Sequence, residues 1–182
     1  PTQEAPSAAL PDVYVYEGYA VSTEAGFDRK SLDYAAQKFR QLYDSYLTGN
    51  AGHIYLSVIP DKGSFTEPPE GYVPASAQET AEALLAQLDF VQYADIALGL
   101  SLADYYRTDP HWRQECLIST AQTLAQAMGV PPVGDLQENT VDAPFYGAYA
   151  EKAEEPLAAD TLRYLTGEVL DACTVYDYET ER

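Results

Sequence analysis

The chain has 182 residues, of which 46% are hydrophobic, a size and composition typical of one globular domain. It carries 29 acidic against 10 basic residues, a formal net charge of −19, so phosphate backbones and anionic membranes would repel its surface. Nucleic-acid binding is therefore not expected. No apolar run reaches the roughly 18 residues that a membrane-spanning helix needs.

The first segment, residues 1–12, is rich in Pro and Ala and lacks the basic and apolar regions of a signal peptide. It predicts a flexible tail, which could be the remnant of a cleaved export signal or membrane anchor. Residues 13–182 then predict a single domain. Cys116 and Cys173 could pair, although their spacing does not establish it, and two isolated cysteines make a poor metal site.

The next elements alternate between strand and helix. Residues 13–21 are rich in β-branched and aromatic side chains and predict a strand. Apolar residues at helical spacing over 29–47 predict a helix, with Asp28 as its N-cap and Gly49 just beyond its end. The mostly apolar run 53–59 then suits a buried strand of a parallel sheet.

The middle of the chain continues this alternation. Residues 60–74 are rich in Pro and Gly and predict a loop at the carboxyl end of the preceding strand, where α/β proteins commonly bind ligands. Ser76 and Glu79 match a capping box at the start of an Ala- and Leu-rich helix. Residues 90–96 suit a short strand.

A further helix is predicted over 111–129, with apolar residues on one face. After it, 143–157 shows no clear period, 159–165 suits a short helix and 170–179 suits a late strand. The alternation predicts an α/β fold with a mainly parallel sheet flanked by helices. About four strands are few for a complete domain of this class.

The stretch YYRTDPHWRQE, residues 105–115, admits a structural and a chemical interpretation. Asp109 suits a helix N-cap, Pro110 the first helical position and Trp112 a core anchor in the first turn. The carboxylate of Asp109 could equally accept a hydrogen bond from Nδ1–H of His111, leaving Nε2 as a base. A histidine at a helix N-terminus would stay neutral, so the two interpretations are compatible.

This stretch, followed by LAQAMG, resembles the Asp-His-His-Trp motif of the DHHW protein family of Gram-positive bacteria. More broadly it is similar to the Asp-x-His-Trp motif of alginate O-acetyltransferase-like proteins with an SGNH hydrolase-type fold. The resemblance extends to IYLSVIPDK at 54–62 and more loosely to 145–149 and 164–179. It implies that the chain corresponds to the N-terminal portion of an SGNH-like domain.

The resemblance implies a role for each residue of the motif. Asp109 matches the acid of a catalytic triad, His111 its general base and Trp112 a structural anchor beneath them. Pro110 departs from the second position of the motif, which lies outside the catalytic pair.

Other candidate ligand-binding residues carry weaker signals. Arg107 and Arg113 flank the motif and could hold an anionic group of the substrate, or could only offset the acidic surface. His53, His111 and Asp109 do not have the spacing usual for a metal site, so no metal is expected. No P-loop or dinucleotide fingerprint occurs, and no cofactor is expected.

The nucleophile is the missing part of the motif. In proteins of this type the serine belongs to an Asp-Ser pair after the Asp-His motif, and this chain has no such pair after His111. Asp44–Ser45 suits the solvated face of a helix, and Ser119 lies too far along a helix to reach the imidazole. Ser64, in the loop after the second predicted strand, is geometrically possible but has no flanking signature.

The implied function is acyl transfer, either O-acetylation or ester hydrolysis, on cell-envelope or exported polysaccharide by an extracytoplasmic protein. His111 would be the base, oriented by Asp109, and the serine is not found in this chain. One alternative is a non-catalytic glycan-binding protein that uses some of its 16 tyrosines as stacking platforms, although tyrosines are more often core and sheet residues. A purely structural accessory domain is the other alternative.

Overall fold

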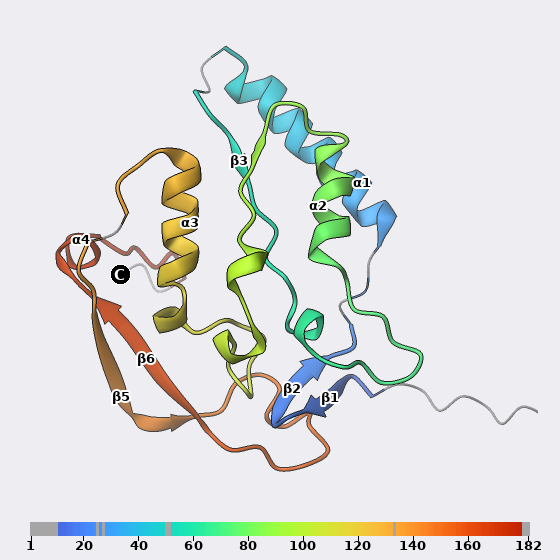
Figure 1. Cartoon of the computed structure of the whole chain (residues 1–182), viewed down its shortest axis with the longest axis vertical. Coiled ribbons are helices and arrows are strands. Elements are labelled where there is room, and N and C mark those ends of the chain that lie inside the picture. Colours follow the sequence, from blue (N-terminus) through green and yellow to red (C-terminus); the bar gives the residue numbers. More distant parts are fainter. Residues whose placement is uncertain (1–10, 25, 27, 50–51, 133, 180–182) are drawn as a thin grey trace, which may run out of the picture.

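The computed structural model describes residues 11–24, 26, 28–49, 52–132 and 134–179, and its elements are arranged as shown in Figure 1. Within these ranges the fold is mixed α/β, with three two-stranded sheets. The predicted mainly parallel sheet is wrong, because only β3 (Tyr55–Leu56) and β4 (Gln92–Tyr93) pair in parallel. The other pairs are antiparallel: β1 (Val13–Tyr16) with β2 (Tyr19–Ser22), and β5 (Gln137–Phe145) with β6 (Asp160–Thr166).

The first predicted strand is in fact a hairpin, β1–β2. Glu17 and Gly18 form its turn, with φ angles of 49° and 81°. Two successive residues with positive φ match the twist of the flanking strands, as the short turns of β-hairpins require. Glu17 and Gly18 separate the two runs of β-branched and aromatic residues, and the prediction of one strand passed over this two-residue turn signal.

The predicted helices before residue 100 are confirmed. α1 (Arg29–Leu42) begins at Asp28, whose side chain accepts from the amides of Lys30 and Ser31, and a π-helical turn (Tyr43–Leu47) continues it. α2 (Ala77–Leu85) begins at Ser76, whose hydroxyl accepts from the amide of Glu79. No helix of the described ranges is both long and apolar enough to cross a membrane.

The core lies where α1 and α2 pack beside β3 and β4 (Figure 1). Ala36 of α1 meets Leu84 and Leu88 from the α2 segment, and residues of the strand segments cover them: Leu56, Val58, Phe90 and Val91. This packing includes Val58, just after β3, and so holds the start of the loop that follows this strand.

Three predictions in the second half of the chain are wrong. The helix expected from 111 begins later, as α3 (Ile118–Met128), and ends at Gly129 in the left-handed conformation as expected. Residues 159–165, expected as a helix, belong to strand β6. Residues 170–179, expected as a strand, contain none, and the short helix α4 (Glu168–Asp171) overlaps their start. β6 exists because it pairs with β5, a partner that local periodicity does not reveal.

Candidate functional site

The segment expected to start a helix is a tight loop. Tyr105 and Trp112 pair across it as an antiparallel bridge, and the amide of Tyr106 donates to the carbonyl of His111 at 3.1 Å. Asp109 is therefore not a helix N-cap, and Pro110 is not a first helical residue. No helix begins at Pro110, so a helix macrodipole gives no reason for His111 to be neutral. The side chain of Asp109 stabilises this loop, because it accepts a hydrogen bond from the backbone amide of His111 two residues later.

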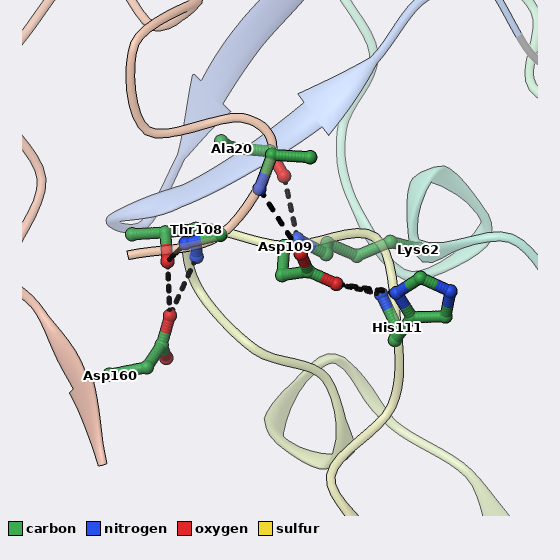
Figure 2. A network of polar contacts seen from close by, with 8 residues as sticks. Ala20, Lys62, Thr108, Asp109, His111 and Asp160 are labelled. Carbon is green, nitrogen blue, oxygen red and sulfur yellow. Dashed lines mark hydrogen bonds and ion pairs between the residues drawn. The ribbon is translucent and has the colours of Figure 1, made fainter. Parts of the chain in front are cut away.

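Asp109 and His111 are in direct contact (Figure 2). Oδ1 of Asp109 accepts from the amide of His111 at 3.0 Å and lies 2.6 Å from its Nδ1. A carboxylate can only accept, so Nδ1 carries the proton and Nε2 is the free base position. The His111 side chain is 79% exposed while that of Asp109 is 12% exposed. The pair thus presents a basic nitrogen to solvent from a buried acid.

The carboxylate of Asp109 is stabilised in its charged form. Burial by itself raises its pKa, but hydrogen bonds from the amides of His111 and Ala148 and from the imidazole outweigh burial and hold the pKa below its usual value. The amide of Ala148 donates to Oδ2 at 3.1 Å, on the side away from His111. Asp109 therefore stays ionised over the range in which His111 could act as a base.

A second buried carboxylate holds the chain just before Asp109 (Figure 2). Asp160, the first residue of β6, accepts from the amides of Arg107 and Thr108, both at 2.8 Å, and from the Thr108 hydroxyl at 2.6 Å. Thr108 is fully buried. Asp160 was not identified from the sequence, because it lay in a segment expected to be helical.

The backbone around Gly147 closes the site from the other side. The amide of Gly147 donates to the Thr108 hydroxyl at 2.9 Å, and that of Tyr149 donates to the Thr108 carbonyl at 2.9 Å. A Cβ at Gly147 would overlap the side chain of Asp109. These residues lie in 145–149, a stretch that the family resemblance covers without giving any residue in it a role. Gly147 itself was the one feature of the stretch that could have indicated a close backbone approach.

A cavity of about 260 Å³ lies beside the imidazole of His111. Pro110 and Trp112 line it from the motif, and the segment after β3 lines it with Ile59, Pro60 and Asp61; Tyr105 completes it. Trp112 is thus a partly exposed wall of the cavity and not a core anchor in a helix. The cavity has room for a small acyl group beside His111.

The two arginines that flank the motif do not line this cavity. Arg107 is exposed, and its guanidinium lies 5.7 Å from the ring centre of Tyr19. Arg113 donates to the carbonyl of Ala103 at 2.6 Å and pairs with Glu115 at 3.5 Å. Arg113 is therefore engaged by the protein itself, while the cation of Arg107 is accessible to an anionic group.

None of the three serines considered contacts His111 among the described residues. The Ser64 hydroxyl donates to the carbonyl of Ala75, Ser45 is exposed in the π-helical turn, and Ser119 lies in the first turn of α3. His53 lies beside Gln92, and no group of three or more potential metal ligands gathers in the described ranges. Cys116 and Cys173 are both free thiols.

The sequence matches no model of a known protein family and no curated protein. Its structure is similar to the crystal structure of a DHHW family protein from Eubacterium siraeum DSM 15702, with a TM-score of 0.60 and 22% identity over 85% of this chain. It is also similar to Bacillus cereus PatB1, with a TM-score of 0.66 and 15% identity over 86% of this chain. A structure of PatB1 with a sulfonyl adduct matches to the same degree.

The match covers only part of each of these proteins. The chain spans 53% of the DHHW family protein and between 57% and 59% of PatB1. At these levels of sequence identity the similarity concerns the fold. The chain therefore shares the fold of a large part of a DHHW family protein and of PatB1.

Proposed function

We propose that this chain carries the acid–base half of an acyl-transfer site that acts on polysaccharide of the cell envelope. The observation that carries the proposal is the 2.6 Å contact between Asp109 and Nδ1 of His111, whose exposed side chain lines a cavity. A neutral imidazole oriented by a carboxylate is the general base of serine-dependent acyl transfer. The similarity to a DHHW family protein supports the same chemistry and extends the proposal to an SGNH-like domain in an extracytoplasmic protein.

In the proposed reaction, Nε2 of His111 takes the proton of a serine hydroxyl as its oxygen attacks the carbonyl carbon of an ester. Asp109 stabilises the imidazolium that results. His111 then returns the proton to the departing oxygen, which breaks the ester bond and leaves an acyl-serine. A polysaccharide hydroxyl or water takes up the acyl group in the second half of the cycle, giving O-acylation or hydrolysis respectively.

The serine of this cycle is the component that the described residues do not place beside His111. A sulfonyl adduct is the product expected when a nucleophile meets a sulfonylating reagent, so its presence on PatB1 supports nucleophilic chemistry on this fold. Arg107 is the proposed contact for an anionic part of the substrate, since its guanidinium is exposed near the motif. Arg113 has a weaker claim to that role because of its internal contacts.

The His111→Ala substitution, made in the full protein in its native cell, should reduce acyl transfer to polysaccharide by roughly 10³-fold or more, because the base is lost. The measurement is the acetate that mild alkali releases from purified envelope polysaccharide, quantified by chromatography. His53→Ala is the matched control, since His53 is the only other histidine and lies beside Gln92. Equal ester content in the two variant strains would reject the proposed function.

The 182-residue chain alone should not react with a fluorophosphonate probe, which labels activated serines. The reason is that Ser64, Ser45 and Ser119 have no contact with His111 in the described structure. Intact mass before and after incubation, followed by peptide mapping, measures the adduct. Labelling of Ser64 that disappears in His111→Ala would show that the chain carries its own nucleophile.

Glycan binding without catalysis is the second candidate function, favoured by exposed tyrosine rings. Tyr46 and Tyr178 are 74% and 86% exposed, and Tyr146, near the site, is 59% exposed. Exposed aromatic rings offer flat apolar faces for stacking on sugars. A binding protein would retain polysaccharide affinity in His111→Ala and lose it in Tyr146→Ala.

A further inference from the structure

Lys62 is a charged side chain in the interior of the protein, next to the site. It is 2% exposed, and its ammonium donates to the carbonyl of Ala20 at 2.7 Å (Figure 2). The ammonium also lies 6.0 Å from the ring centre of Tyr19 and 5.7 Å from that of Tyr149. Its surroundings are thus one carbonyl oxygen and two aromatic faces, all of which attract a cation.

Carboxylates surround this ammonium at longer range. Burial lowers the pKa of Lys62 to about 8, while the charges of Asp160, Asp109 and Asp61 oppose that shift. The group is therefore largely protonated at pH 7. Burying a charge without a close ion-pair partner costs stability, and an apolar side chain of similar volume would avoid that cost.

The partners of Lys62 are the same residues that hold the chain before Asp109. The amide of Ala20 donates to the carbonyl of Arg107 at 2.8 Å, and the amide of Tyr149 donates to the carbonyl of Thr108 at 2.9 Å. Lys62 thus lies between two backbone anchors of the segment that leads into Asp109. A shift of its ammonium would move both anchors.

We propose that Lys62 is a positioning residue for the Asp109–His111 pair. Its ammonium fixes Ala20 and lies against the Tyr149 ring, and its positive charge interacts electrostatically with the carboxylate of Asp109. Lys62 acts through Asp109 and does not touch the reacting atoms. The proposal deepens the proposed function and rests on it only for the consequence in catalysis, because the geometry of the pair is measurable without turnover.

The test compares Lys62→Met and Lys62→Gln with the wild-type chain by NMR. Methionine removes charge and donor, whereas glutamine keeps a donor but no charge. In both variants the pKa of the Asp109 carboxyl, followed by its ¹³C shift, should rise, because a nearby positive charge is lost. The downfield Nδ1–H resonance of His111 should broaden or disappear. Lys152→Met is the control, because Lys152 is exposed and its ammonium lies 5.9 Å from the same Tyr149 ring.

A folded Lys62→Met variant with the wild-type Asp109 pKa and His111 resonance would overturn the proposal, and so would a Lys62→Gln variant that behaves as wild type. If neither variant folds, the unmutated chain supplies the test. Its Asp109 ¹³C shift should change with a midpoint near pH 8, together with the Cε resonance of Lys62. Independent titrations would overturn the proposal. Positive results without any acyl transfer would instead reject the proposed function and leave the role of Lys62 standing.

The charged and titratable groups that surround Lys62 decide whether a midpoint near pH 8 can be assigned to its ammonium. They come from five segments: Tyr19 on β2, with Arg107 beyond its ring, Asp61 on the adjoining turn, Asp109 in the motif loop, Tyr149 after β5, and Asp160 on β6. Burial raises the pKa of Tyr149 above its ordinary value of 10.0, so its hydroxyl titrates above the midpoint expected for Lys62.

Discussion

Replacing Gly147 with alanine should lower the free energy of unfolding by about 3 kcal/mol and separate Asp109 from His111. The new Cβ would overlap Cβ, Cγ and Oδ2 of Asp109, more closely than real Cβ atoms approach other atoms. Neither side can withdraw easily, because the Gly147 amide is bonded to the Thr108 hydroxyl and Asp109 is bonded to the next amide, that of Ala148. Urea denaturation measures the stability and the His111 Nδ1–H resonance reports on the pair.

Gly99→Ala is the matched control for this substitution. Gly99 is exposed, its φ is not in the left-handed region, and a Cβ there would meet no atom within 4 Å. The control should change the free energy of unfolding by less than about 0.5 kcal/mol. If Gly147→Ala were as stable as Gly99→Ala and kept the His111 resonance, the close contact between Gly147 and Asp109 would be contradicted.

Replacing Asp160 with asparagine should also cost about 3 kcal/mol of unfolding free energy, since three hydrogen bonds to a charged acceptor are weakened together. Asparagine keeps one acceptor oxygen, but its NH2 group would face either the amide of Arg107 or the amide and hydroxyl of Thr108, which are themselves donors. The segment leading into Asp109 should then loosen. Hydrogen exchange of the Arg107 and Thr108 amides should accelerate in proportion to the loss of stability.

Asp142→Asn serves as the control for Asp160→Asn, since it makes the same change of charge at an exposed position of β5. It should leave the exchange of both amides unchanged. Fast exchange in both variants would mean that net charge, and not the hydrogen bonds of Asp160, governs the stability of the segment. Slow exchange in both would mean that Asp160 is dispensable.

The helices before residue 100 could be predicted from sequence because their signals are local. Asp28 and Ser76 accept from amides two or three residues away, and apolar spacing marks the buried face of α1. The strands could not be placed as well. β6 depends on pairing with β5, and the Glu17–Gly18 pair between two apolar runs is a turn signal that the prediction of a single strand passed over. The expected parallel sheet reduces to one short pair, β3–β4.

In the candidate site, too, the local contacts could be predicted from the sequence and the long-range contacts could not. The contact between Asp109 and His111 spans two residues, so the spacing alone indicated it as one of two open interpretations, and the structure shows it. The supposed helix start at Pro110 was wrong, because the Asp-Pro pair suits a tight loop as well as a helix N-terminus. Asp160 and Ala148 could not be found from the motif, because they reach it from distant positions in the chain.

The hydrogen bonds that hold the motif loop have a consequence for the order of folding. The bonds from Gly147 and Ala148 join residues 39 positions apart, and those to Asp160 join residues 52 and 53 positions apart. Closing such long segments costs chain entropy before any contact compensates it, so these bonds form late. During synthesis the motif therefore leaves the ribosome as an open segment. The loop that carries Asp109 and His111 is therefore fixed against the rest of the fold only after the segments of β5 and β6 have been made, although the contact between the two residues is itself local.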